Sequence, residues 1–435
     1  MQTADLYNIF LKYPLVSTDS RNCPQGSIFF ALKGDKFDGN DYIEQVLSNG
    51  AAYAVGDREN LPQNGRIIHV DNVLKSLQDL ANYHRKQLKT KVIAITGTNG
   101  KTTTKELIAA ALSSMYPILY TQGNLNNHIG VPLTLLQLKP EHRFAVIEMG
   151  ANHQGEIRDL CRIADPDYGL ITNVGKAHLE GFGSFEGVIK TKTEMYEYLR
   201  EKGGVIFVNI DNQILKERSE NTNRIFYGTS PEAYIQGRII DSEPFLEMEW
   251  KNLPSLCGEG SGEGLIKTQL VGNYNFENVL AAICMAAYFG NGSFVQAIEN
   301  YTPTNNRSQS LKTQRNQLII DAYNANPSSM KVALDNFSAL KVSPKMVIFG
   351  EMKELGEYSC EEHQKLVDNL RESAIDKVIL CGESFRYTNS IPKEWNVFSN
   401  INELSNYLKS ENISGFHILI KGSRTNQLEK TIEFL

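Results

Sequence analysis

Cysteine is scarce in this chain, whose 435 residues include six cysteines and no Cys-x-x-Cys pair. Structural zinc sites and disulfide frameworks need cysteines at short, regular spacings. The six lie far apart in the sequence, at Cys23, Cys161, Cys257, Cys284, Cys360 and Cys381. The sequence therefore indicates neither a zinc site nor a disulfide framework, and we expect reduced thiols with packing roles.

Long apolar runs and an excess of positive charge are also absent. No stretch approaches the roughly 20 apolar residues that span a bilayer, and the N-terminal MQTADLYNIF lacks a signal-peptide pattern. The net charge of -6 argues against a nucleic-acid binder. We therefore expect a cytoplasmic protein with no membrane span and no nucleic-acid partner.

The stretch from Lys91 to Met115 predicts a strand, a glycine loop and a helix in direct succession. Lys91–Thr96 is rich in β-branched residues, as buried strands are. The loop that follows is GTNGKT, from Gly97 to Thr102. Apolar residues then recur at helical spacing on one face: Leu107, Ile108, Ala111, Leu112 and Met115.

This loop has the features of a phosphate cradle. Its glycines let the backbone approach phosphate oxygens, and the helix N-terminus directs amides at them. Lys101 adds a positive charge, and Thr102 offers a hydroxyl to Mg²⁺. The cradle is shorter than the common phosphate loop, because Ile95 stands where that loop has its first glycine. The alternative is a glycine turn without a ligand.

Length and apolar content limit the architectures that the chain can adopt. A prior of about 150 residues per domain predicts about three domains, and 41% hydrophobic residues can fill their cores. Alternating strand and helix patterns predict an α/β fold. We expect a small N-terminal α/β domain over residues 1–86, a central parallel-sheet domain over 87–301 and a Rossmann-like doubly wound domain over 302–435. Within residues 222–271, alternating segments predict antiparallel strands instead.

Polar residues follow several predicted strands of the central domain, at the edge of a parallel sheet where ligands bind. Glu148 ends one strand and could hold Mg²⁺ directly or through water. His178 and Glu180 lie in the loop after another strand, and Lys192 lies on the helix that follows. An ordinary surface histidine is the alternative for His178. In the first domain, the turns at Ser17–Arg21 and Gly34–Tyr42 are either binding loops or plain surface turns.

Several motifs in a fixed order make the chain resemble the Mur ligases of peptidoglycan synthesis over essentially its whole length. They are ITGTNGKTTTKE, GNLNNHIGVPLTLL, EMGANHQGEI, NVGKAHLEGFGS, GNYNFENVLAA, DAYNANPSSM, FGEMKELG and IKGSR. The short phosphate loop is normal for this family. The resemblance implies ATP-dependent ligation of D-alanyl-D-alanine to UDP-N-acetylmuramoyl-tripeptide through an acyl phosphate, by a monomer that uses ATP and Mg²⁺.

The resemblance also implies a set of site residues. Those expected at ATP are Gly97, Thr98, Asn99, Gly100, Lys101, Thr102, Thr103, Asn278, Arg307, Asp321 and Asn324. Those expected to ligate metal are Thr102, Glu148, His178 and Lys192, and the expected catalytic residues are Lys101, Glu148, His178 and Lys192. Those expected to bind the nucleotide-sugar substrate are Ser20, Arg21, Gly34, Asp38, Gly39 and Asn127. Two residues depart from the family pattern, His128 after the Asn pair and Asn40 after Asp-Gly.

Lys192 aligns with a lysine that many Mur ligases carry as a carbamate. Near a divalent cation a free ammonium is repelled and a carbamate is attracted. An unmodified lysine on a solvated helix face is the alternative, with Glu180 as the rival ligand. We find no Ser-His or Cys-His nucleophile arrangement, so we expect catalysis by positioning and electrostatics.

Other functions remain open on the sequence. Another amino-acid ligase of this fold is one, although the third-residue Mur ligase would carry a DNPR motif that the third domain lacks. A folylpolyglutamate synthase would have no use for the uridine-binding turns. A regulatory nucleotide hydrolase would need no third domain that presents Arg307 and Asp321 to the nucleotide. The sequence leaves open whether the tripeptide ends in diaminopimelate or lysine.

Overall fold

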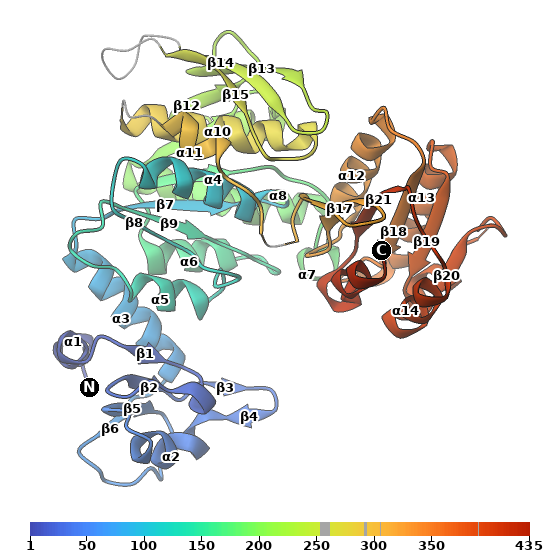
Figure 1. Ribbon diagram of the computed structural model, residues 1–435. Helices are drawn as coiled ribbons and strands as arrows, with labels where there is room; N and C mark the ends of the chain where they lie inside the picture. Colours follow the sequence, from blue (N-terminus) through green and yellow to red (C-terminus); the bar gives the residue numbers. More distant parts are fainter. Residues whose placement is uncertain (253–261, 291–293, 305, 390) are drawn as a thin grey trace.

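The computed structural model describes residues 1–435 except 253–261, 291–293, 305 and 390. Three α/β units follow one another along the chain (Figure 1). The strands of the described residues form a four-stranded, a nine-stranded and a six-stranded sheet and one two-stranded ribbon. This arrangement confirms the predicted three-domain α/β fold.

The N-terminal unit is built on a small parallel sheet with the order β1-β2-β5-β6. Its central strand β2 reads IFF and is buried on both faces, which explains its run of apolar residues. The elements are α1 (Thr3–Lys12), β1 (Val16–Ser17), β2 (Ile28–Phe30), β3 (Lys33–Gly34), β4 (Phe37–Asp38), α2 (Ile43–Ser48), β5 (Tyr53–Gly56), β6 (Ile67–His69) and α3 (Val73–Gln87).

The central unit carries the nine-stranded sheet, with the order β15-β14-β13-β12-β11-β10-β7-β9-β8. The predicted antiparallel segments are confirmed, because β14 pairs antiparallel with both β13 and β15. The first elements are β7 (Lys91–Thr96), α4 (Lys101–Ser113), β8 (Ile118–Tyr120), α5 (Gly130–Leu135), β9 (Phe144–Glu148), α6 (Glu156–Ala164), β10 (Tyr168–Ile171), α7 (Leu179–Phe182) and α8 (Phe185–Lys202). The others are β11 (Val205–Asn209), α9 (Gln213–Arg218), β12 (Asn223–Gly228), β13 (Ile235–Asp241), β14 (Glu247–Asn252), β15 (Glu263–Lys267), α10 (Phe276–Phe289) and α11 (Phe294–Glu299).

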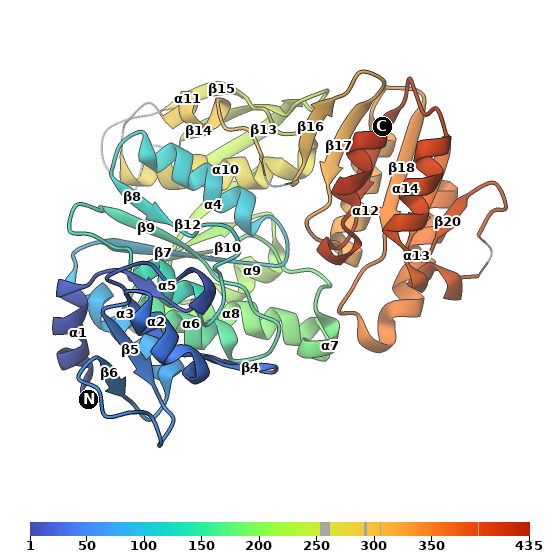
Figure 2. The ribbon, with the colours of Figure 1, turned by 60° about the horizontal axis from the view of Figure 1, so that its bottom comes forward.

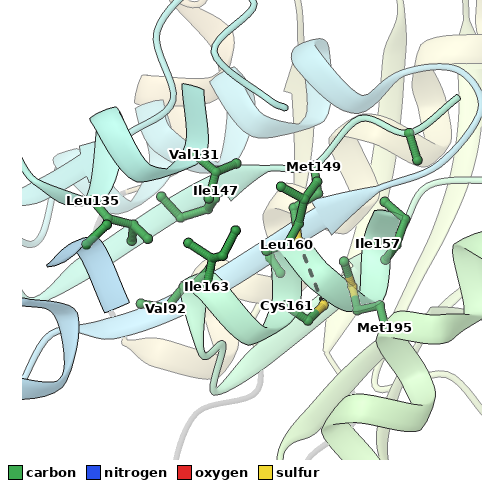
Figure 3. Close-up of a cluster of buried hydrophobic side chains, with 14 of the residues drawn as sticks. Val92, Val131, Leu135, Ile147, Met149, Ile157, Leu160, Cys161, Ile163 and Met195 are labelled. Atoms are coloured by element: carbon green, nitrogen blue, oxygen red, sulfur yellow. Dashed lines mark hydrogen bonds between the residues drawn. The ribbon is translucent and has the colours of Figure 1, made fainter. Parts of the chain in front are cut away.

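Helices cover both faces of the central sheet (Figure 2). Alternate residues of β7 point to opposite faces, so Val92 belongs to the core under α5, α6 and α8, and Ile93 to the core under α4 and α10. Figure 3 shows the first of these cores, to which Val92 of β7, Leu160 of α6 and Met195 of α8 all belong. The phosphate loop therefore rises from a strand that is fixed on both sides.

The C-terminal unit has a six-stranded sheet with the order β16-β17-β21-β18-β19-β20. Among the strands described there, only β16 runs antiparallel, and it begins at Gln309. The elements are β16 (Gln309–Lys312), β17 (Gln317–Asp321), α12 (Pro327–Ala339), β18 (Lys345–Gly350), α13 (Ser359–Glu372), β19 (Lys377–Cys381), β20 (Asn396–Phe398), α14 (Ile401–Ser410) and β21 (His417–Lys421).

Two expectations from composition can be compared with the described part of the chain. No helix in it is long and apolar enough to cross a membrane. Its cysteines are free thiols, and Cys161, Cys284 and Cys381 are buried. Cys257 lies outside the described residues.

Helix α3 joins the N-terminal unit to the central unit through buried polar contacts. Arg85, 6% exposed, donates from Nη2 to Asp167 Oδ2 at 2.8 Å and from Nε to the carbonyl of Ala164 at 3.2 Å. Asn82 Nδ2 donates to the carbonyl of Arg162 at 2.8 Å. The side chain of Leu80 is fully buried in the shared core. The helix is therefore attached to the central unit as well as to its own domain.

We predict that Arg85→Met lowers the melting temperature by roughly 5 °C, because it removes one partner of a mostly buried ion pair at a cost of about 2 kcal/mol. Calorimetric unfolding measures this. Arg238→Met is the matched control, since Arg238 pairs with Glu249 at 2.7 Å but is 72% exposed, and an exposed pair contributes little. Equal losses in the two variants would contradict the role given to Arg85.

Candidate active site

One cleft of about 1550 Å³ is lined by residues of α3, of the central unit and of the C-terminal unit. It brings together most residues predicted to bind nucleotide and metal: Thr98, Asn99, Gly100, Lys101, Thr102, Thr103, Glu148, His178, Asn278, Arg307, Asp321 and Asn324. Asn127, predicted to lie by the substrate, lines it too. Among the described residues the lining does not include Gly97, Lys192 or the predicted uridine-binding residues.

The phosphate loop can be formed only with glycine at its two ends. Gly97 has φ +142° and Gly100 has φ +78°, values that other residues rarely adopt. A Cβ on Gly97 would lie 2.0 Å from Thr172 Oγ1, and one on Gly100 would lie 2.5 Å from Asn278 Oδ1. The loop therefore packs without clearance against β10 and α10. Although Gly97 does not line the cleft, it sets the loop's shape.

Lys101 lies at the start of α4 and folds back over the loop. Its Nζ donates to the carbonyl of Gly97 at 2.7 Å and to that of Thr98 at 3.0 Å. Burial lowers the pKa of Lys101 to about 8, a shift that Glu148 opposes and Arg307 reinforces. The ammonium is thus held where phosphate oxygens would meet the loop.

Glu148 ends β9 and is 2% exposed. Its Oε1 accepts from Thr102 Oγ1 at 3.2 Å and from Asn126 Nδ2 at 2.8 Å. Its Oε2 is buried and accepts no hydrogen bond from any residue that the structure describes. Sequence reasoning missed Asn126, which lies in the same Asn-Asn pair as Asn127 and was therefore within reach of the motif.

These donors fit Mg²⁺. Mg²⁺ favours oxygen ligands and is commonly held by one or two carboxylates together with substrate phosphates. Thr102 and Glu148 supply a hydroxyl and a carboxylate side by side, with Thr102 Oγ1 3.2 Å from Glu148 Oε1. Over the described chain, no group of three or more His, Cys, Asp and Glu side chains is placed to hold a metal. A cation here would therefore complete its coordination with nucleotide oxygens and water.

His178 lies in the cleft but contacts the C-terminal unit. It precedes α7 with φ +50°, and its Nδ1 forms an ion pair with Glu354 Oε2. Glu354 belongs to the motif FGEMKELG, yet sequence reasoning gave it no role. The hydrogen bond with His178 lowers the pKa of the Glu354 carboxyl. His178 therefore joins the central unit to the C-terminal unit.

Lys192 lies under the site instead of in its lining. It is 2% exposed, and its Nζ is 5.3 Å from the centre of the Phe182 ring. Burial lowers the pKa of Lys192 to about 7; Lys101 adds to this shift, and Glu156 and Glu194 oppose it. The solvated helix face that was the alternative for Lys192 is thus wrong. The rival ligand Glu180 is exposed and does not line the cleft.

The C-terminal unit places charged groups opposite the phosphate loop. The Arg307 guanidinium stacks 3.7 Å from the centre of the Tyr323 ring. Lys421, buried at 2% exposure, donates from Nζ to Asp321 Oδ2 at 2.5 Å and to the carbonyl of Asn324 at 3.2 Å. Sequence reasoning had quoted Lys421 within IKGSR without assigning it a partner.

Direct hydrogen bonds join this unit to two loops of the central unit, one of them the phosphate loop. Asn326 Nδ2 donates to Asn99 Oδ1 at 2.8 Å, and the backbone amide of Lys176 donates to Ser328 Oγ at 2.9 Å. Asn326 also caps α12 through the amide of Ser329. Asn326 therefore links the start of α12 to the phosphate loop.

The predicted uridine-binding residues lie away from the cleft lining, in the N-terminal unit. Arg21 is exposed and pairs with Asp19 at 2.9 Å. Asp38 accepts from the amide of Asn40 at 2.9 Å and from Arg58 Nη2 at 2.9 Å. Asn40, a departure from the family pattern, is buried at 4% exposure and ties the Asp38 turn to Asp57. Sequence reasoning missed Asp57 and Arg58 because they lie outside both turns.

Together, the fold and the cleft define a three-domain enzyme that binds a nucleotide at a phosphate loop, with its outer domains contributing to the same cleft. Three family profiles match successive parts of the chain: "Mur ligase family, catalytic domain" over residues 12–96, "Mur ligase middle domain" over residues 95–286 and "Mur ligase, glutamate ligase domain" over residues 306–424. The chain belongs to the Mur ligase family.

Relatives match along nearly the full length. A Bacillus subtilis protein named UDP-N-acetylmuramoyl-tripeptide--D-alanyl-D-alanine ligase is 35% identical over 97% of this chain and 92% of its own. An Escherichia coli protein of the same name is 33% identical over 97% of this chain and 93% of its own. The crystal structure of a MurF ligase from Thermotoga maritima in complex with ADP has a TM-score of 0.86 and 26% identity, and the match covers 98% of this chain and 97% of that one.

Proposed function

We propose that this chain is an ATP-dependent ligase that joins D-alanyl-D-alanine to UDP-N-acetylmuramoyl-tripeptide and releases ADP and phosphate. The product would be the UDP-linked pentapeptide precursor of peptidoglycan. The observation that carries this proposal is the match to ligases of that name over nearly the whole of both chains. The cleft supports it, because a phosphate loop and the C-terminal unit meet there. Cytoplasmic location and a monomeric state remain predictions.

Each unit has a part in this proposal. Residues 1–86 would bind the uridine diphosphate of the first substrate, through Ser20, Arg21, Gly34, Asp38 and Gly39. Residues 87–301 would bind ATP, with Asn278 at the adenine. Residues 302–435 would bring Arg307, Asp321 and Asn324 to the nucleotide and receive the dipeptide.

The chemistry requires activation of a carboxylate. Transfer of the γ-phosphoryl group of ATP to the tripeptide carboxylate gives an acyl phosphate, and the dipeptide amine then displaces phosphate through a tetrahedral intermediate. Mg²⁺, when bound, would neutralise charge on the transferred phosphoryl group. Thr102 and Glu148 would hold that cation, and Lys101 would place a fixed positive charge at the loop. The amides at the start of α4 would orient the phosphates.

The alternatives explain less of the structure. A regulatory nucleotide hydrolase has no use for the contacts that Asn326 and Ser328 make with the loops of the central unit. A folylpolyglutamate synthase has no use for a first domain whose Asp38 turn is built into a network with Asn40 and Arg58. The ligase proposal gives both features a role.

Phosphate release from ATP tests the proposal directly. The enzyme should release phosphate when both UDP-N-acetylmuramoyl-tripeptide and D-alanyl-D-alanine are present, and omission of the dipeptide should stop sustained turnover. Parallel reactions with a tripeptide ending in diaminopimelate or in lysine would identify the natural substrate. Steady ATP hydrolysis that neither substrate changes would overturn the proposal.

We predict that Lys101→Ala abolishes ligation, because it removes the cation from the cradle. The pKa of Lys101 is lowered to about 8, so the ammonium is still the main form at neutral pH but is less stable in the folded chain than in the unfolded one. Loss of this side chain should therefore not lower the melting temperature. The phosphate-release assay and a thermal melt provide the two readouts. Turnover equal to that of the parent would contradict the cradle assignment.

Lys192 has the protonation behaviour that carbamate formation requires. Only a neutral amine reacts with CO₂, and roughly one ordinary lysine in 2,500 is neutral at pH 7. With its pKa lowered to about 7, about half of Lys192 would be neutral at that pH. This supports the proposal that Lys192 acts as a carbamate and, through it, as a metal ligand.

We predict that Lys192→Ala loses most activity and that acetate or formate restores part of it by supplying a carboxylate in the vacated space. Lys190→Ala is the matched control, because Lys190 lies on the same helix and is exposed. Carbon-13 NMR of the parent in labelled bicarbonate should show a carbamate signal that the alanine variant lacks. Full activity of Lys192→Ala would leave Lys192 with a packing role only.

We predict that a non-hydrolysable ATP analogue and the tripeptide substrate together draw the C-terminal unit toward the central unit, because Arg307 and Asp321 would then both contact nucleotide. Small-angle scattering should show a smaller radius of gyration than for the free protein. Asn326→Ala, which loses the contact with Asn99, should compact less. An unchanged radius in the parent would count against closure.

A further inference from the structure

Lys105 is a buried lysine that the proposed mechanism leaves without a role. It lies on α4 one turn beyond Lys101 and is 1% exposed. Its Nζ is 3.8 Å from Glu148 Oε2 and 3.8 Å from Glu106 Oε1. The cleft lining includes Glu148 but, among the described residues, not Lys105. The ammonium therefore lies beside the carboxylate without lining the cleft.

The two oxygens of Glu148 are held in different ways. Oε1 accepts hydrogen bonds from Thr102 and Asn126, whereas Oε2 accepts none within the described structure and has the Lys105 ammonium as its ion-pair partner. A buried carboxylate oxygen without a compensating charge is costly. Lys105 thus fixes which oxygen of Glu148 points into the protein.

We infer that Lys105 is a positioning residue that holds Glu148 so that a bound cation meets Oε1 alone. This inference rests on the assignment of Glu148 as a Mg²⁺ ligand in the proposed function. Because Lys105 occupies the side of Oε2, the carboxylate cannot turn to grip the cation with both oxygens. Its positive charge also weakens the attraction between Glu148 and the cation.

Lys105 is itself held on its other side. The Glu106 carboxylate accepts a hydrogen bond at Oε2 from the Tyr301 hydroxyl at 2.5 Å, and the Tyr120 ring lies 5.8 Å from the Lys105 ammonium. Tyr301 follows α11, just before the segment that leads to Arg307. Three parts of the chain, β8, β9 and the segment after α11, therefore help to hold the ammonium between the two carboxylates.

Lys105→Met tests the inference through the Mg²⁺ dependence of ADP binding. Calorimetric titration with ADP in EDTA, and then over a series of Mg²⁺ concentrations, gives the half-saturating Mg²⁺ concentration. Without the ammonium, Glu148 can use both oxygens and meets no opposing charge, so this concentration should fall by about tenfold or more. In the ligation assay kcat should fall at the same time, because the carboxylate is no longer held in one orientation.

Three further variants separate positioning from packing. Lys105→Arg keeps the charge and should keep the parent's Mg²⁺ requirement. Lys345→Met is the matched control, since Lys345 is also buried, at 6% exposure, in the C-terminal unit, where its Nζ donates to the Ser338 carbonyl; it should leave the Mg²⁺ requirement unchanged. Tyr301→Phe is the milder change should Lys105→Met not fold. It removes the Tyr301 hydrogen bond to Glu106 and so strengthens the attraction of Glu106 for Lys105, and the requirement should fall by about two- to threefold.

Thermal melts supply a readout that needs no turnover. In EDTA, Lys105→Met should melt below the parent, and Mg²⁺ with ADP should raise its melting temperature more than the parent's. A Mg²⁺ requirement that is equal in the parent, Lys105→Met and Tyr301→Phe would overturn the inference and leave the proposed function standing. ADP binding by the parent that ignores Mg²⁺ would overturn the metal assignment, and the inference with it.

Discussion

The close contact between the two glycines of the phosphate loop and their neighbours is the constraint on which the rest of the site depends. Gly97 and Gly100 bring the backbone against Thr172 and Asn278 with no space for a Cβ. As a result, the end of β10 and the start of α10 are held at a fixed distance from the loop. Residues from distant parts of the sequence, Asn173 among them, can then hydrogen-bond it directly.

This precision requires a rigid foundation, which the central sheet provides. Both faces of β7 are buried under helices, so the strand that delivers the loop cannot rotate or slide without disturbing two cores. The apolar character of α10 on nearly every side has the same origin, because it packs between α4 and the sheet. The rigid sheet therefore keeps the positive Lys101 and the negative Glu148 in place, although the site is partly shielded from water.

Local sequence patterns predicted the features that depend on interactions between residues close together in the sequence. The alternation of strands and helices, the cradle and the antiparallel segments near residues 235–252 followed from periodicity and glycine spacing. Pairings between residues far apart in sequence were missed, such as His178 with Glu354 and Asp321 with Lys421, because no spacing rule encodes which strand ends face each other. Lys192 was assigned correctly to a helix after the His178 loop, but only burial could show that its amine lies below the cleft lining.

The polar contacts of α3 set the dimensions of the cleft. Arg85 and Asn82 fix this helix to the central unit, and the first domain's sheet packs on the same helix. The helix therefore sets the separation between the turns predicted to bind uridine and the phosphate loop. Under the proposed function, the enzyme acts as a ruler: a substrate anchored by its nucleotide at one end presents its carboxylate to ATP only if the intervening peptide has the matching length. Chain length would then be read by geometry before any side chain of the peptide is recognised.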